Sequence, residues 1–242
     1  MLLALLAGLT LADCGSGGSA GEASTLRVLA AASLTEPFTA LEQTYEKEHP
    51  GIDVVLSFDS SAILVEQLSQ GLAADVLATA DQRSMDEAVA ADVIANTPEP
   101  FATNTLVIAT PAGNPGRIKD LDDLAGATFA VCVPAAPCGD ATQRLFELDR
   151  FAGKPATEEE NVKGVLTKVT SGEVDAGLVY ASDAKAAGAK VDVVRAENAS
   201  EVVTVDSIAA VEGGEAAQDW IDLVTGTAGQ EVLASHGFGP RP

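Results

Sequence analysis

Hydrophobic and polar positions follow two periods along the chain. Short apolar runs predict buried strands at residues 26–31, 52–58, 75–80, 105–110, 127–133, 174–180, 191–194 and 202–211. Apolar residues at helical spacing predict helices that begin after residues 33 and 81, and helices at 62–70, 120–124, 141–150, 162–170, 219–224 and 230–234. Because strands and helices alternate throughout, we expect an α/β fold with largely parallel sheets.

The segment 26–41 contains the first strand and helix of this pattern. Its apolar first half predicts a strand, and a helix is expected to follow almost at once. Ser33 and Glu36 have the spacing of a capping box, so we expect Ser33 to be the N-cap of that helix. Phe38 and Tyr45 follow on one helical face, which predicts that both lie in the core.

Several predicted helix starts carry a hydroxyl group or a small residue. They are Ser33, Ser61, Cys138–Gly139 and Asn161–Val162, and Tyr180 adds a hydroxyl at the end of a strand. In open α/β sheets, ligands bind beyond the carboxyl ends of the strands, where helix N-termini also point. Amide and hydroxyl donors gathered there would bind a fully deprotonated oxyanion without a charged side chain. The alternative is that each residue only caps its own helix.

The charge of the chain limits its possible partners. It carries 36 acidic against 14 basic side chains, a formal net charge of −22. Nucleic-acid binding needs clusters of basic residues, so we expect no nucleic-acid partner. An anion would have to be held by local dipoles and neutral donors, against an unfavourable overall field.

The N-terminus has the composition of an export signal. Its apolar run is too short to span a bilayer but matches the apolar region of a secretory signal. Residues 11–14, Leu-Ala-Asp-Cys, are similar to a lipoprotein cleavage site with Cys14 as the lipidated residue, although Asp13 replaces a small residue and no Lys or Arg precedes the run. The alternative is a buried N-terminal helix. We expect residues 1–25 to be signal and tether, and the protein to be extracytoplasmic and lipid-anchored to the outer face of the cell membrane.

Cys132 and Cys138 lie six residues apart on a proline-rich loop. In an exported protein, two such cysteines are expected to form a disulfide. A redox-active pair is the alternative, but the spacing differs from the Cys-x-x-Cys of oxidoreductases.

Six short motifs are spread over residues 26 to about 238. They are 31–35 (Ala-Ala-Ser-Leu-Thr), 58–61 (Phe-Asp-Ser-Ser), 74–82 (Ala-Asp-Val-Leu-Ala-Thr-Ala-Asp-Gln), 85–86 (Met-Asp), 161–164 (Asn-Val-Lys-Gly) and 177–183 (Gly-Leu-Val-Tyr-Ala-Ser-Asp). In this order they resemble the periplasmic molybdate-binding proteins of molybdate ABC importers. The resemblance implies a type II periplasmic-binding-protein fold, in which two α/β lobes joined by two hinge strands hold an oxyanion between them. It places one lobe at 26–102 plus 206–242 and the other at 103–205.

The resemblance also implies the binding residues. Ser33 and Ser61 would donate hydroxyl and backbone N–H groups from the first lobe. From the second lobe, Cys138 and Val162 would donate backbone N–H groups and Tyr180 its hydroxyl. The implied ligand is molybdate or tungstate, held through its oxygens, with no cofactor and no catalytic residue. The implied partner is the membrane permease of an ABC importer, and we expect the protein to be a monomer.

Asp59 departs from the family pattern, which often has a small neutral residue there. As a solvated loop residue it would have no effect on the ligand. If it faces the ligand, it would favour phosphate, which keeps a proton near neutral pH and needs an acceptor. More generally, sulfate, phosphate or an organic anion is the alternative ligand within the binding class.

An enzyme, namely a hydrolase that uses Ser33 or Ser61, is the alternative to a binding protein. A serine nucleophile needs a histidine base and an orienting acid. The chain has only His49 and His236, both expected far from these serines, and neither serine lies in a Gly-x-Ser-x-Gly motif. We therefore expect a binding protein rather than an enzyme.

Overall fold

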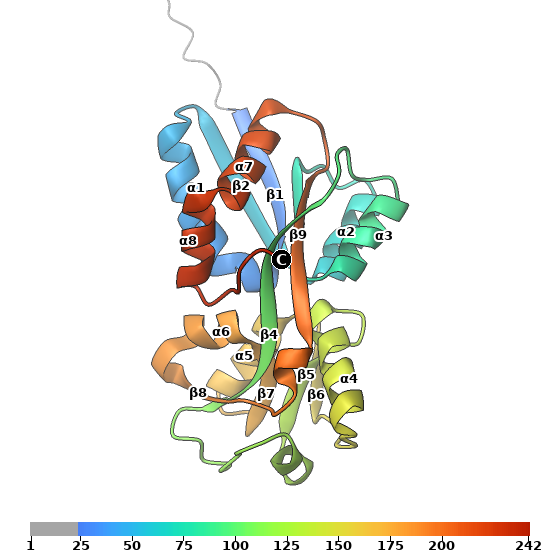
Figure 1. Cartoon of the computed structure of the whole chain (residues 1–242), viewed down its shortest axis with the longest axis vertical. Coiled ribbons are helices and arrows are strands. Elements are labelled where there is room, and N and C mark those ends of the chain that lie inside the picture. The colour runs from blue at the N-terminus through green and yellow to red at the C-terminus, as the bar shows by residue number, and fades with distance from the viewer. Residues whose placement is uncertain (1–23) are drawn as a thin grey trace, which may run out of the picture.

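The computed structural model describes residues 24–242 (Figure 1). The predicted signal and Cys14 lie outside the described residues. Ser24 and Thr25 were expected in the tether, but they begin strand β1 (Ser24–Ala31) and pair with β2. Among the helices of this described part, none has the length and apolar character that a membrane crossing requires.

The strands form one continuous mixed sheet. Its order is β2-β1-β3-β9-β4-β7-β5-β6, and β8 pairs with β4. The strands after β1 are β2 (Ile52–Asp59), β3 (Val76–Thr79), β4 (Glu99–Pro111), β5 (Phe129–Cys132), β6 (Thr157–Glu159), β7 (Ala176–Tyr180), β8 (Val191–Val194) and β9 (Val203–Ala210). The α/β class is confirmed. Parallel pairing does not predominate, because the described strands pair antiparallel wherever β4 or β9 takes part.

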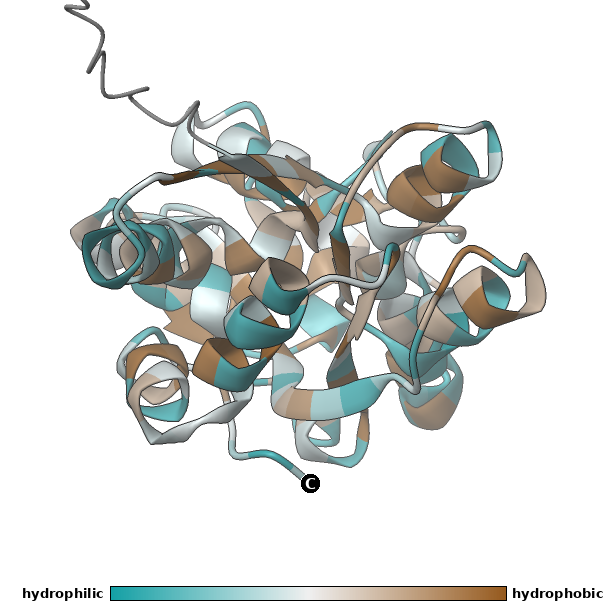
Figure 2. Ribbon diagram, turned by 90° about the horizontal axis from the view of Figure 1, so that it is seen from above, coloured by the Kyte–Doolittle hydropathy of each residue, from teal (hydrophilic) through white to brown (hydrophobic). Residues whose placement is uncertain are grey.

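Strands β4 and β9 join two groups of elements (Figure 1). One group holds β1 to β3 with α1 (Thr35–Glu48), α2 (Ser61–Ser69), α3 (Gln82–Ala90), α7 (Glu215–Thr225) and α8 (Thr227–Ser235). The other holds β5 to β8 with α4 (Pro137–Asp149), α5 (Val162–Thr170) and α6 (Ala181–Ala187). Seen from above, helices surround the central strands, and most carry both hydrophobic and hydrophilic residues, as expected for helices with one face in the core (Figure 2).

The aromatic core of the first group confirms the prediction for helix α1. Phe38 and Tyr45 are fully buried, and each makes an edge-on contact with the ring of Trp220, at centroid distances of 5.6 and 5.5 Å. The Tyr45 hydroxyl donates a hydrogen bond to the carbonyl of Ala216. This contact fixes α1 against α7 and so positions the segment that leads into α1.

The start of α1 differs from the prediction. Ser33 lies inside a short 3-10 helix (Ala32–Leu34), and α1 begins only at Thr35, without a side-chain cap. Pro37 in the first turn has no N–H group, so one of the amides that a cap would satisfy is missing. The Ser33–Glu36 capping box is therefore wrong, and both side chains are available for other contacts.

Candidate functional site

A pocket lies where the two groups of elements meet, and all five predicted site residues line it. Its lining consists of Ala31, Ala32, Ser33, Asp59, Ser60, Ser61, Ala80, Pro137, Cys138, Asn161, Val162 and Tyr180. The empty space is about 210 Å³ even when the open mouth is included. Pockets for drug-sized molecules occupy about 300–1,000 Å³, so this one is of a size for a small ion.

The serines of the first group supply hydroxyl groups to the pocket. The Ser33 hydroxyl is buried and has no hydrogen-bond partner within residues 24–242. The oxygen of Ser61 accepts a hydrogen bond from the Ala80 amide at 3.0 Å. Because a hydroxyl can accept and donate at once, Ser61 keeps its proton for a ligand.

Ser60 is a pocket residue that the sequence reasoning missed. Its hydroxyl is buried and also has no partner in the described part of the chain. It occupies the N-cap position of α2 but makes no capping hydrogen bond. The pair Ser60–Ser61 could have indicated this, since either serine can stand at the helix start.

Cys138 lies in the first turn of α4, which begins at Pro137, four residues before the predicted start. Proline suits this position because its missing N–H is not needed there. The amides of Gly139 and Asp140 donate to the carbonyl of Ala136. The Cys138 amide belongs to the helix end at which N–H groups lack an intrahelical acceptor.

The predicted disulfide between Cys132 and Cys138 is confirmed. It ties the end of β5 to the first turn of α4. A Cβ atom on Gly139 would lie only 1.9 Å from the carbonyl oxygen of Val133, so only glycine permits this close approach. Together, the disulfide and the glycine fix the position of the Cys138 amide.

Helix α5 begins as predicted. The Asn161 side chain accepts a hydrogen bond from the Gly164 amide and caps the helix, and Val162 is its first residue. Gly177 of β7 lets α5 pack directly on the strand, because a Cβ atom there would lie within 2.8 Å of Val165 and Val169. This packing brings the N-terminus of α5 beside the end of β7.

Tyr180 is the last residue of β7, and its hydroxyl is buried without a partner among the described residues. The pKa of Tyr180 is raised well above 10. Burial is the main cause, and the nearby carboxylates of Asp206, Asp81 and Asp183 add to it. The phenol therefore stays protonated and can donate to an anion at neutral pH.

Asp59 is the one charged side chain in the lining of this pocket. Its Oδ1 atom accepts hydrogen bonds from the Asn161 amide group at 3.0 Å and from the Ser60 backbone N–H at 2.7 Å. These two donors partly offset its charge. The contact with Asn161 also links β2 to the N-cap of α5 across the pocket.

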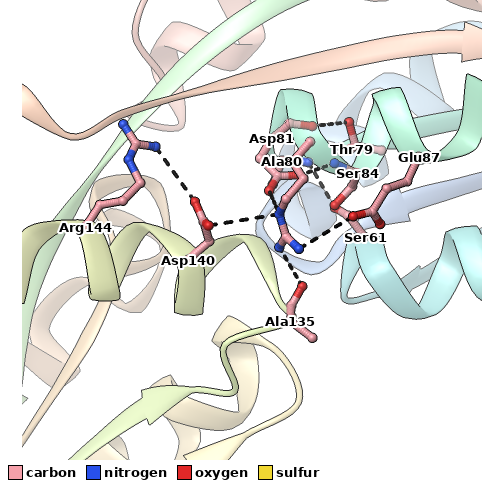
Figure 3. Close-up of polar contacts among 10 residues, drawn as sticks. Ser61, Thr79, Ala80, Asp81, Ser84, Glu87, Ala135, Asp140 and Arg144 are labelled. Atoms are coloured by element: carbon pink, nitrogen blue, oxygen red, sulfur yellow. Dashed lines mark hydrogen bonds and ion pairs between the residues drawn. The ribbon is translucent and has the colours of Figure 1, made fainter. Parts of the chain in front are cut away.

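Two cationic side chains also connect the two groups of elements beside the pocket. Lys163 contacts Glu36 of α1 and, at 3.0 Å, the fully buried Asp183 of α6. The Arg83 guanidinium donates to the carbonyl of Ala135 at 2.8 Å. Figure 3 shows Ala135 on the loop before α4, opposite Ser61 of the first group.

The buried ion pair shifts the pKa values of both partners. Burial raises the pKa of Asp183 to about 6, although Lys163 opposes this rise. Burial lowers the pKa of Lys163, but the carboxylates of Asp183 and Glu36 outweigh this effect, and the net pKa is raised. At neutral pH the two groups therefore form an ion pair.

Neither histidine lines this pocket. The His49 ring stacks on Tyr45 near Asp219, and His236 contacts Ser235 at the end of α8. The serines of this pocket therefore have no histidine beside them that could act as a base. Within residues 24–242, no group of three or more His, Cys, Asp and Glu residues is placed to hold a metal ion.

Residues 26–239 match the family model described as bacterial extracellular solute-binding protein. The chain belongs to this family. Curated relatives include the molybdate-binding protein ModA of Mycobacterium tuberculosis H37Rv, which is 40% identical over 246 residues, covering 97% of this chain and 94% of the relative. ModA of Escherichia coli K12 is 33% identical over 252 residues, covering 98% and 97%.

Solved structures share the fold of this solute-binding protein. The periplasmic molybdate-binding protein of Azotobacter vinelandii aligns with a TM-score of 0.77 and 20% identity, over 90% of this chain and all of that chain. The sulfate-binding protein SubI of M. tuberculosis aligns with a TM-score of 0.76 and 18% identity, over 90% and 87%. At these identities, the likeness concerns the fold alone.

Proposed function

We propose that this solute-binding protein captures molybdate in the pocket between its two groups of elements and delivers it to an ABC importer. The observation that carries the proposal is the convergence of hydroxyl and helix N-terminal donors from both groups on one ion-sized pocket with no Lys or Arg in its lining. The 40% identity to ModA over nearly the whole chain supports molybdate as the ligand. The relatives are transport proteins, and we propose no enzymatic activity.

In this proposal, five residues hold the oxyanion. Ser33, Ser61 and Tyr180 donate their hydroxyl groups, and Cys138 and Val162 donate backbone N–H groups. Hydrogen bonds to a charged group contribute about 1.5–3 kcal/mol each, and the helix N-termini add favourable dipoles. Donors of this kind suit an acidic protein, since they bind a dianion without a free cation.

The two groups of elements would act as lobes, 26–102 plus 206–242 and 103–205, with β4 and β9 as hinge strands. Each lobe supplies part of the donor set, so molybdate would bind the closed arrangement better than an open one. The permease would then recognise the closed protein. Tungstate, an oxyanion of similar size and charge, is proposed to bind in the same way.

Sulfate or phosphate is the second candidate ligand, and the position of Asp59 bears on phosphate, which keeps a proton near neutral pH. The carboxylate of Asp59 lines the pocket and could accept a hydrogen bond from a protonated oxyanion. Its Oδ1 atom already accepts two hydrogen bonds. This use of the carboxylate favours a fully deprotonated ligand, such as molybdate, over phosphate.

The deciding experiment is calorimetric titration of molybdate, tungstate, sulfate and phosphate into the purified protein. We expect molybdate and tungstate to bind tightly with one ion per chain, and the other two at least tenfold more weakly, since about 1.4 kcal/mol separates each tenfold step. Tighter binding of sulfate or phosphate would overturn the ligand assignment.

We also propose that the protein acts as a monomer outside the cytoplasm, lipid-anchored through Cys14. Mass spectrometry of the protein from a membrane fraction would detect a diacylglyceryl-modified N-terminal cysteine. An unmodified N-terminus after Cys14, or a protein found only in the soluble fraction, would contradict the anchor.

A further inference from the structure

Asp206 is a carboxyl group buried beside the hinge, without an evident role in the oxyanion site. It lies in β9, opposite Ala102 of β4, and is 1% exposed. Within residues 24–242, neither of its side-chain oxygens has a hydrogen-bond partner. An unpaired carboxylate in such a place is strongly disfavoured, and such groups take up a proton instead.

Two other acids lie close enough for their charges to act on this carboxyl group. They are Asp81, the N-cap of α3 in one group of elements, and Asp183 of α6 in the other. Burial first, and then the charges of these two acids, raise the pKa of Asp206 well above its ordinary value. The Tyr180 phenol is also close enough for the Asp206 charge to affect its pKa.

The cations near this region are engaged elsewhere. Lys163 pairs with Asp183 and Glu36, and Arg83 lies 3.7 Å from Asp81 while it donates to a backbone carbonyl. On α4, Arg144 lies 3.9 Å from Asp140 at the protein surface (Figure 3). No ion pair of Asp206 is found in the described chain.

We propose that Asp206 holds a proton in the closed, ligand-bound protein, and that oxyanion binding is therefore coupled to protonation of this carboxyl group. The inference rests on the proposed binding of molybdate between the lobes. An ionised Asp206 would repel Asp81 on one side and Asp183 on the other, and so oppose closure.

The sign of the pH dependence follows from linkage. In this proposal the open protein lets water reach the carboxylate, so that closure and a bound dianion both raise the pKa of Asp206 above its value in the open protein. Affinity is therefore full at low pH and falls as the pH rises through the Asp206 pKa of the open protein, by up to about tenfold per pH unit. In that range, each bound molybdate brings with it up to about one proton.

The test is calorimetric titration of sodium molybdate into the purified protein, from about pH 6 to about pH 9, in buffers with different heats of ionisation. We expect the wild type to take up protons on binding and to lose affinity as the pH rises. The variant Asp206→Asn should take up none and should keep the low-pH affinity throughout. Binding by the wild type without proton uptake overturns the proposal, and this readout does not depend on any variant folding.

Two further variants identify the titrating group. Asp53→Asn removes the same charge from an exposed position near the opposite end of β2 from the pocket, and should retain the wild-type proton uptake. If Asp183→Asn abolishes proton uptake while Asp206→Asn retains it, Asp183 is the responsible group and the proposal is wrong. Absence of any molybdate binding would instead overturn the proposed function, and the coupling with it.

Discussion

The Nζ atom of Lys163 lies 2.7 Å from the carboxylate of Glu36, in a contact that joins α5 to α1 across the edge of the pocket. Lys163 directly follows Val162, a proposed amide donor to the ligand. In the proposed mechanism, this contact therefore forms in the same closed arrangement that places this donor. The same lysine also neutralises the buried Asp183, so it has two separable roles.

The first prediction concerns the proposed closure of the two lobes around the ligand. Glu36→Gln removes the ion pair across the pocket but leaves the pair of Lys163 with Asp183 intact. Partly exposed ion pairs contribute about 0.2–1 kcal/mol, so molybdate affinity should fall by up to about fivefold, and less at high salt. Calorimetry measures this change. Glu48→Gln, at the exposed end of the same helix, is the matched control and should bind as the wild type does.

The second prediction concerns the Tyr180 hydroxyl. Tyr180→Phe should weaken molybdate binding about 10- to 150-fold, the equivalent of about 1.5–3 kcal/mol for a hydrogen bond to a charged ligand. Stability without ligand should not fall, because this hydroxyl has no hydrogen-bond partner among the described residues. Tyr45→Phe should show the opposite result, lower stability with unchanged affinity, since Tyr45 donates to Ala216 far from the pocket. Equal affinity in both variants would remove Tyr180 from the site.

Ser61→Ala should differ from Tyr180→Phe. The change removes a donor to the ligand and also the acceptor of the buried Ala80 amide. Leaving such an amide unpaired costs about 1–3 kcal/mol, so both affinity and the free energy of unfolding should fall. Urea denaturation and calorimetry together separate the two effects. A loss of stability with unchanged affinity would show that Ser61 has only a structural role.

The fourth prediction concerns the disulfide. Cys132→Ser combined with Cys138→Ser should lower the free energy of unfolding by about 2 kcal/mol, because the short loop is no longer closed in the unfolded chain. Molybdate affinity should also fall, since the Cys138 amide loses its fixed position. A reducing agent should reproduce both effects in the wild type and have no effect on the double variant. An affinity that is insensitive to reduction would contradict this role.

The fifth prediction concerns pH and the buried ion pair. Lys163→Met leaves the buried Asp183 without its cation, which should cost about 3 kcal/mol of stability at pH 8. The pKa of Asp183 is already raised to about 6 in the wild type. The contribution of this carboxyl group to the free energy of unfolding is therefore full at low pH, where it is protonated, and is lost as the pH rises through that value. Without Lys163 this pKa rises further. The variant should therefore be much less impaired at pH 5, as denaturation at the two pH values will show.

Much of the local structure could be predicted from the sequence. The N-cap of α5 at Asn161, the strand that ends at Tyr180 and the disulfide all depend on residues close together in the chain. The residues expected to line one pocket do so. The capping box at Ser33 failed because residues 32–34 form a 3-10 helix and α1 begins only at Thr35, and the spacing of Ser33 and Glu36 does not reveal this.

The alternation of strands and helices, the positions of most helix starts and the acidity that calls for neutral donors were determined by the sequence alone, because they depend on side chains that lie near one another along the chain. The tertiary structure alone decided that Glu36 meets Lys163, that Asp59 meets Asn161 and that Asp206 is buried among other acids. These residues are distant in the chain, and they meet only because β4 and β9 connect the two groups of elements. These contacts decide which charges are paired, and they leave the buried carboxyl group of Asp206 without a hydrogen-bond partner in the described residues.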